Sequence, residues 1–164
     1  INPANQKWFG TLSGAFLMSA EGTQEIRAFD ITNSPMLSDR IISLAVLPST
    51  GEVFFGTDRG IISFRDVSTT PWSSLNQVVA YPNPVPVNYS GVIGIKGLTE
   101  NTNIKITDTQ GRLVYETTST GGQATWNGAN FDGQAVVPGV YRIYCAQQDG
   151  TQTGATTILI LGSN

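Results

Sequence analysis

A short aromatic motif occurs twice in this sequence, and the second copy follows the first by 46 residues. Trp8-Phe9-Gly10-Thr11 is matched by Phe54-Phe55-Gly56-Thr57, and after two variable residues each copy continues with a glycine, Gly14 or Gly60. Each copy predicts a hairpin with an aromatic first strand and a glycine where the turn needs a positive φ. A period in the forties that holds about four short strands is typical of a β-propeller.

The repeat predicts that residues 1–66 are terminal blades of an incomplete β-propeller. This segment holds about one and a half repeats, whereas a closed propeller needs about four to eight blades. We therefore expect earlier blades to lie outside this chain, and the open blade edge or face to pair with another chain, so that the chain could self-associate. A free-standing β-meander is the alternative, and it would make the 46-residue step a coincidence.

The rest of the chain predicts a linker and a second β-domain. Residues 67–77 lose all periodicity, which is typical of a linker. From residue 78 to 164 about seven short strands alternate with turns, and this pattern favours an immunoglobulin-like β-sandwich. Only 13% of the residues are charged and 18 are glycine, so that strands and polar turns are expected in place of helices. The predicted fold class is all-β.

Hydrophobic alternation within residues 78–164 predicts which side chains point into the sandwich. Two prolines in Tyr81-Pro82-Asn83-Pro84 cannot donate to a β-ladder, so this segment should leave the sheet. A hairpin with its turn at residues 108–111 follows, and a later strand precedes the last hairpin. The side chains expected to point inward from these strands are Ile104, Ile106, Leu113, Tyr115, Tyr141, Ile143 and Cys145.

Both halves resemble known families. Residues 33–64 are similar to the two-component-regulator type of propeller repeat. Residues 79–162 resemble a type A sorting domain of the type IX secretion system of Bacteroidota, through Tyr81–Val85, Ile104–Tyr115, Pro138–Tyr144 and a short terminal apolar strand in that order. The central stretch Thr125–Gly128 also resembles the immunoglobulin-like domain of flagellar hook-capping proteins.

The resemblance implies a non-catalytic accessory or scaffold module of the type IX attachment machinery. Such a protein would be exported through the periplasm to the outer-membrane surface or the extracellular space, and would engage type IX or sortase components and anionic lipopolysaccharide. The motif residues that would serve partner recognition are Pro82, Asn83, Pro84, Asp108, Gly111, Gly139 and Tyr141. The alternatives are a ligand-binding sensor ectodomain of a hybrid two-component regulator, and the sorting tail of a secreted hydrolase or adhesin.

The chemistry that the sequence lacks points to a protein that is not an enzyme. The sequence contains no histidine, which removes Ser-His-Asp and Cys-His catalysis and the commonest zinc ligand. Cys145 is expected to be an inert core thiol. Residues 127–133 carry the oxygen ligands that calcium favours but lack the EF-hand spacing, so we expect a solvated loop. No cofactor or metal site is predicted.

Three tryptophans and the charge balance complete the expectations. Trp8 and Trp126 are predicted core residues and Trp72 is predicted to be exposed, while a sugar-stacking platform built from all three is the alternative. Lys and Arg number 9 against 12 Asp and Glu, so the basic surface that nucleic-acid binding needs is not expected. No apolar run reaches the roughly 18 residues of a membrane span.

Overall fold

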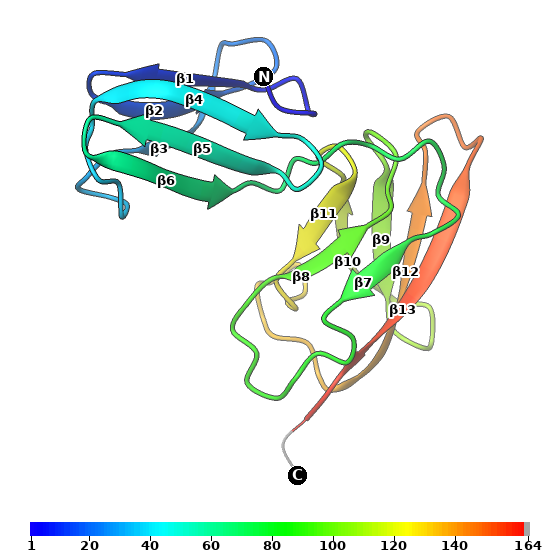
Figure 1. Cartoon of the computed structure of the whole chain (residues 1–164). Helices are drawn as coiled ribbons and strands as arrows, with labels where there is room; N and C mark the ends of the chain where they lie inside the picture. Colours follow the sequence, from blue (N-terminus) through cyan, green and yellow to red (C-terminus); the bar gives the residue numbers. More distant parts are fainter. Residues whose placement is uncertain (163–164) are drawn as a thin grey trace. The chain divides into compact units, whose positions relative to one another are not determined.

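The computed structural model describes residues 1–162, and within this range the chain forms strands and no helix. The predicted all-β class is thus confirmed. The chain divides into two compact units (Figure 1), residues 1–70 and a second unit that begins at Pro71. Each unit has its own hydrophobic cluster. Among the described residues there is no helix long and apolar enough to cross a membrane.

The first unit consists of six strands in two three-stranded antiparallel sheets. The first sheet contains β1 (Lys7–Thr11), β2 (Gly14–Met18) and β3 (Glu25–Phe29), and the second contains β4 (Ile41–Leu47), β5 (Glu52–Thr57) and β6 (Gly60–Arg65). Each sheet is a simple meander, with the middle strand paired to both of its sequence neighbours.

The two copies of the aromatic motif form the same hairpin. The Thr11 hydroxyl donates to the Gly14 carbonyl at 2.9 Å, and the Thr57 hydroxyl donates to the Gly60 carbonyl at 2.9 Å. Both glycines have positive φ, 121° and 133°. A Cβ at Gly14 would also lie 2.3 Å from the Phe29 carbonyl oxygen, so this position requires glycine. The internal repeat is therefore a structural repeat of one hairpin.

An aromatic cluster lies between the two sheets of the first unit. The ring of Trp8 stacks on Phe29 at a centroid distance of 6.0 Å and meets the edge of Phe55 at 5.4 Å. The guanidinium of Arg27 lies over the ring of Phe64 at 5.0 Å, at the border of the cluster. Burying these aromatic rings contributes to the apolar stabilisation of this small unit, together with the aliphatic side chains of the same cluster.

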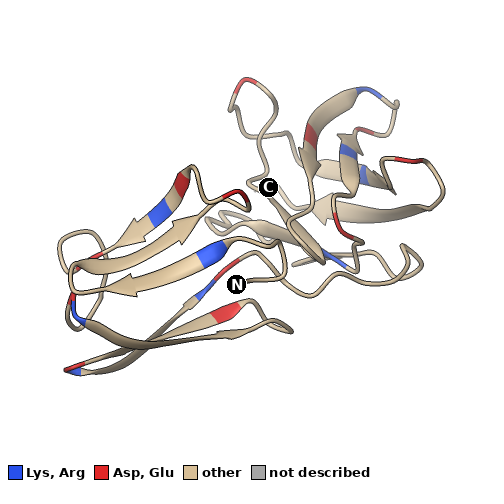
Figure 2. Cartoon of the chain, turned by 90° about the horizontal axis from the view of Figure 1, so that it is seen from above, with Lys and Arg blue, Asp and Glu red and all other residues tan. Residues whose placement is uncertain are grey.

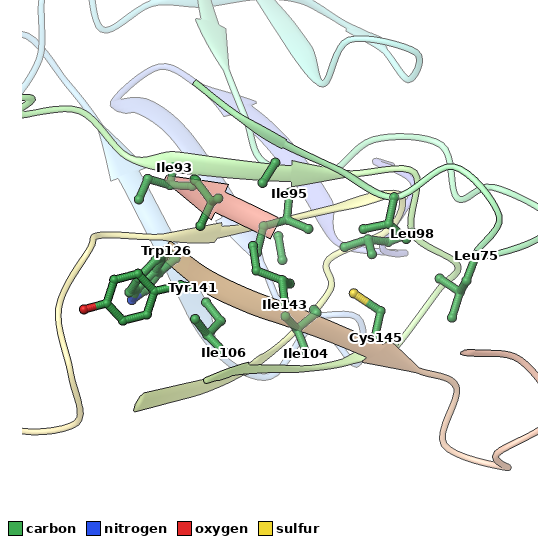
Figure 3. Packing of buried hydrophobic residues seen from close by; sticks show 14 of the residues in the cluster. Leu75, Ile93, Ile95, Leu98, Ile104, Ile106, Trp126, Tyr141, Ile143 and Cys145 are labelled. Atoms are coloured by element: carbon green, nitrogen blue, oxygen red, sulfur yellow. The ribbon is translucent and has the colours of Figure 1, made fainter. Parts of the chain in front are cut away.

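The second unit has seven strands in two antiparallel sheets. One sheet has the order β11 (Gln123–Trp126), β8 (Ile93–Lys96), β7 (Val79–Tyr81), and the other has the order β10 (Leu113–Thr118), β9 (Asn103–Thr107), β12 (Gly139–Ala146), β13 (Thr153–Ile160). Side chains from both sheets, with Ile95, Ile106 and Ile143 at the centre, form one core (Figure 3).

Residues 67–77, the predicted linker, make specific contacts with the two units. Ser68 is fully buried and its hydroxyl accepts a hydrogen bond from the backbone N–H of Ala4 at 2.9 Å. Leu75 is buried in the core of the second unit, and the N–H of Trp72 donates to the Leu98 carbonyl at 2.8 Å. The stretch that the sequence predicts to be a linker is therefore packed at both of its ends, through Ser68 in the first unit and through Trp72 and Leu75 in the second.

The inward alternation holds for most of the second unit but fails at one end of β10. Ile104, Ile106, Tyr141, Ile143 and Cys145 are buried, as predicted. Leu113 is 45% exposed, so its predicted inward position is wrong. The cause is a β-bulge between Leu113 and Tyr115, which shifts the register against β9 and breaks the period of two. Tyr115, beyond the bulge, is half-buried against the core.

The three tryptophans lie where the sequence predicts. Trp8 and Trp126 are buried in the two separate cores, and Trp72 is exposed. They do not form a common platform within one unit, because Trp8 belongs to residues 1–70 and the other two to the second unit. Charged positions are spread over strands and turns with both signs interspersed (Figure 2).

Candidate functional site

The segment Pro82–Val85 passes from β7 in one sheet to the outer edge of β13 in the other. The N–H of Val85 donates to the Leu159 carbonyl at 2.7 Å, and the N–H of Leu161 donates to the Val85 carbonyl at 3.1 Å. Val85 thereby forms an isolated parallel bridge with Ile160. The prolines leave the sheet of β7, as predicted, and the chain then pairs with the edge of the other sheet.

Asn83 fastens this segment to β13 through both ends of its side-chain amide. Its Nδ2 donates to the Thr157 carbonyl at 2.9 Å, and its Oδ1 accepts from the N–H of Leu159 at 3.0 Å. Proline lacks an N–H, so Pro82 and Pro84 cannot make these bonds from the backbone. The amide side chain supplies a donor and an acceptor in their place, and it covers part of a sheet edge that would otherwise be open.

Replacing Asn83 with alanine is expected to lower the free energy of unfolding by about 1–2 kcal/mol, because two hydrogen bonds are lost. The Leu159 amide should lose its protection against hydrogen exchange, measured by NMR. In Asn83→Asp the carboxylate can still accept from Leu159 but cannot donate to Thr157 when ionised, so the Leu159 amide should stay protected. Equal exchange of Leu159 in the wild type and the alanine variant would show that the amide contributes no protection.

The turn at Asp108 is held by its own side chain. Oδ1 of Asp108 accepts from the N–H groups of Gln110 and Arg112 at 2.9 and 3.0 Å, and Oδ2 accepts from Nε of Arg112 at 2.7 Å. Desolvation raises the pKa of Asp108, but the hydrogen bonds from Arg112 and Gln110 and the Arg112 charge outweigh it and hold the pKa below its usual value. Gly111 completes the turn with φ of 83°. Both residues are explained by turn geometry.

Tyr141 follows Gly139 on β12 and is a structural residue. Its ring packs edge-on against Trp126 at a centroid distance of 5.7 Å, and its hydroxyl donates to the Val137 carbonyl at 2.8 Å. Burial, and to a smaller extent the Asp108 charge, raise the pKa of Tyr141 above its usual value, so the phenol is neutral at physiological pH. The hydroxyl thus fixes the segment that precedes β12.

An open groove of about 620 Å³ lies between the Asp108 turn and residues 130–141. It brings together Asp108, Gly139 and Tyr141 of the predicted recognition residues, whereas Pro82, Asn83 and Pro84 lie on the β13 edge and do not line it. Gly111 belongs to the adjoining turn but is not part of the lining. The predicted set therefore occupies two separate places in the second unit.

Polar side chains at the groove, such as Asp108 and Asn130, already form hydrogen bonds within the chain. The Asn130 side-chain oxygen accepts from the N–H groups of Asp132 and Gln134, both at 3.0 Å. Four exposed apolar side chains line the groove: Phe131, Val137, Leu113 and Val140. Val137 and Phe131 are the most exposed of them, and the centroid of the Phe131 ring lies 5.9 Å from that of Tyr115. The groove therefore presents these apolar side chains and the Arg112 guanidinium, whose side chain is 76% exposed, to solvent.

The side chains that could bind a metal ion, and the single cysteine, can be located within residues 1–162. No group of three or more Cys, Asp or Glu side chains in this range is placed to hold a metal. In the loop that carries calcium-type oxygens, the Asn127 side-chain oxygen accepts from the N–H of Ala129 at 3.1 Å. Burial raises the pKa of Cys145 to about 12, so its thiol stays protonated at neutral pH.

Neither the two hydrogen bonds of Asn83 nor the exposure of Phe131 and Val137 was predicted from the sequence. The signal for the two hydrogen bonds of Asn83 is its position between two prolines, because its amide offers a donor and an acceptor where the neighbouring residues lack an N–H. The exposed pair of Phe131 and Val137 lies in stretches that the sequence shows only as polar loop and turn. Their approach to the Asp108 turn depends on long-range packing.

Comparisons with known proteins found one matching family and a similar solved structure. The family model described as "Secretion system C-terminal sorting domain" matches residues 79–160. A solved structure of PorZ, described as an essential bacterial surface component of the type-IX secretion system of Porphyromonas gingivalis, shares 30% sequence identity with a TM-score of 0.65. That match covers 98% of this chain and 22% of the PorZ chain, so the chain spans about a fifth of the PorZ length. No curated protein matches. Because the family model covers half of the chain, this protein belongs to the secretion system C-terminal sorting domain family.

Proposed function

We propose that this chain is a non-catalytic accessory module of type IX secretion at the cell surface, and that its second unit engages secretion or lipopolysaccharide-handling partners. The observation that carries the proposal is the combination of two matches in one chain. The sorting-domain family covers residues 79–160, and the PorZ structure aligns with 98% of the chain, including residues outside the family match. A sorting domain alone would account for only the first of these.

The architecture that accompanies this role is a propeller end followed by an immunoglobulin-like domain. Two three-stranded meanders with the same aromatic hairpin support the interpretation of residues 1–66 as terminal, incomplete blades. Seven strands in two sheets around one core support an immunoglobulin-like sandwich for residues 78–164. Both assignments are part of the proposal.

A role in binding without catalysis fits the chemistry of the described residues. The sequence has no histidine, the Cys145 thiol is protonated, and the Asp108 carboxylate is occupied by its own turn. Recognition would then use shape and apolar contact at the groove, through Phe131 and Val137. Secretion or sortase components are the partners that this surface would meet, and anionic lipopolysaccharide is a further candidate ligand.

The proposal is tested in the full-length protein, in a bacterium with a working type IX system. We expect that deleting residues 79–164 abolishes surface delivery or modification of type IX cargo. The double variant Phe131→Ala/Val137→Ala should reduce it while the protein accumulates at wild-type level, because both side chains are exposed. Val92→Ala, an exposed position outside the groove lining, is the matched control. Unchanged cargo delivery after the deletion would refute the proposal.

The family match also favours a second candidate, the sorting tail of a secreted hydrolase or adhesin. In that case residues 71–164, fused behind a periplasmic reporter, would carry the reporter to the cell surface. Cargo delivery would then be unaffected by the deletion, since only the protein's own export would fail. The two outcomes separate an accessory of the machinery from one of its substrates.

A further inference from the structure

The four-stranded sheet of the second unit has a face that points away from the core. On β12 the side chains of Ile143 and Cys145 are buried in the core, so those of Arg142 and Tyr144 point to the opposite side of the sheet. Both residues are exposed, Tyr144 to 44%. The outer face of this sheet therefore carries a cation and an aromatic ring on one strand.

The pairing registers place a second cation and short side chains around this ring. Lys105 of β9 lies directly opposite Tyr144, and Ala155 of β13 lies opposite it on the other side. Thr157 of β13 lies opposite Arg142. Directly opposite residues have Cβ atoms about 4.5–5.5 Å apart, so these five side chains are neighbours. We call Arg142, Tyr144, Lys105, Ala155 and Thr157 the basic face.

The side of the basic face toward β13 is hollowed. An open hollow of about 340 Å³ is lined by Arg142, Tyr144 and residues 155–157. Ala155 and Thr157 are shorter than the side chains opposite them, which leaves room above β13. Thr157 is exposed, and its hydroxyl can both donate and accept a hydrogen bond. A ligand in this hollow would touch a ring, a guanidinium and a hydroxyl.

The charge of the basic face is opposite in sign to the net charge of the chain, which is −3. Three ion pairs are present in residues 1–162, and Arg142 is in none of them. Lys105 approaches Glu116 at only 4.0 Å, and that carboxylate also accepts a hydrogen bond from Nδ2 of Asn103 at 2.7 Å. An anion at the basic face would therefore meet a guanidinium without a competing carboxylate.

We propose that the basic face binds an acidic saccharide, that is, a sugar that carries a carboxylate or a phosphate group. Arg142 and Lys105 would contact the anionic group, and the ring of Tyr144 would lie against the sugar ring. The inference rests on the proposed function and deepens it, because it gives an anionic ligand a surface of its own on the second unit. None of the five residues lines the groove beside the Asp108 turn.

Each part of the basic face fits one part of such a ligand. The planar guanidinium of Arg142 can donate two parallel hydrogen bonds to a carboxylate or a phosphate. The flat ring of Tyr144 has a negative face, which attracts the C–H groups on one side of a pyranose ring. An acidic peptide would use the two cations alone, and a neutral sugar would leave them without a counter-ion. An acidic saccharide is the occupant that uses the whole face.

Two matched pairs of sugars test the proposal on the purified full chain. The first pair is trigalacturonate and its methyl ester, and the second is glucose 6-phosphate and glucose. We expect NMR shift changes at the amides of β12 and β13 with at least one of the acidic sugars, and none with the neutral partners at the same concentration. The affinity should fall as salt is added, because the two cations are exposed and are screened by ions.

Substitutions separate the contributions of charge and ring. Arg142→Ala should weaken binding at least about tenfold, because it removes a charge-assisted hydrogen bond. Arg59→Ala removes the same charge at an exposed turn of the first unit and should leave the affinity unchanged. Tyr144→Leu should weaken binding, whereas Tyr144→Phe keeps the ring and should bind like the wild type. Unshifted amides in the core of the second unit establish that each variant is folded.

Three results would overturn the proposal. The first is that neither acidic sugar shifts the amides of β12 and β13. The second is equal binding of an acidic sugar and its neutral partner, which would show that the cations are not used. The third is binding of polyglutamate as tight as that of the sugars and unaffected by Tyr144→Leu, which would show a charged surface without a sugar site. Because binding is measured on the purified chain, its result is independent of the cargo-delivery test of the proposed function.

Discussion

Replacing Phe55 with alanine is expected to lower the unfolding temperature of the first unit by more than about 10 °C, because truncating a buried aromatic ring costs about 3–5 kcal/mol in a unit of this size. Phe55 is 1% exposed and contacts the rings of Trp8 and Phe29 at centroid distances of 5.4 and 6.1 Å. Small units have only about 5–15 kcal/mol of total stability, so the loss removes a large part of it.

Phe54→Ala provides the matched control for this experiment. Phe54 precedes Phe55 on β5, so its side chain lies on the opposite face and outside the cluster. The unfolding temperature of this variant should change by only a few degrees. Hydrogen exchange of peptides from residues 1–70 measures the effect, and residues 71–162 serve as the internal reference because the two clusters share no residue. Equal losses in the two variants would contradict the assignment of faces.

The repeat made the strands of the first unit predictable, but not the use of their faces. Periodicity identifies the hairpins around Gly14 and Gly60, and the two hairpins share their hydrogen bonds. A repeat alone would suggest that Trp8 and Phe54 have the same surroundings. Their burial differs because Trp8 faces the contact between the two sheets, whereas Phe54 lies outside the cluster on the other side of its sheet. Only the packing of one sheet on the other determines which face of each is covered.

In the second unit, the regular strands followed from the sequence and the irregular segments did not. The alternation that predicted Ile143 and Cys145 as buried depends on local backbone geometry. The bulge that exposes Leu113 adds one residue to a strand, and no residue type at that position predicts a bulge. Leu75 lies in a stretch without periodicity, so its place in the core is fixed by distant contacts.

The same distinction applies to the candidate site. Asp108 and Gly111 lie in a turn whose residues can be recognised locally. Asn83 acts on Thr157 and Leu159, more than seventy residues away, and such a pairing becomes visible only when the two sheets are placed. Sequence motifs therefore identified the residues, whereas the structure separated them into a sheet-edge contact and a groove.

Replacing Trp126 with alanine is expected to destabilise the second unit by about 3–5 kcal/mol. The side chain is 1% exposed, and its Nε1 donates to the Ala129 carbonyl at 2.7 Å. Truncation would leave a cavity beside Tyr141 and an unpaired buried carbonyl at Ala129. The effect should appear in denaturant unfolding and in hydrogen exchange of residues 71–162.

Trp72→Ala and Trp126→Phe separate the causes of this loss. Trp72 is exposed, so its truncation should change stability by less than about 0.5 kcal/mol. Trp126→Phe keeps most of the ring but removes the donor to Ala129, and it should cost less than Trp126→Ala. A Trp126→Ala protein as stable as the wild type would contradict the assignment of Trp126 to the core, and a Trp72→Ala protein as unstable as Trp126→Ala would contradict the exposure of Trp72.

The position of Trp126 also links the core to the groove. Its hydrogen bond fixes Ala129, the loop that follows carries Phe131, and its ring supports Tyr141, which holds Val137. A Trp126→Ala protein that fails in cargo delivery would therefore show only that the unit must be folded. Phe131→Ala/Val137→Ala removes the two most exposed apolar side chains of the groove and leaves these supports in place, so a loss of delivery in that variant is evidence for recognition at the groove.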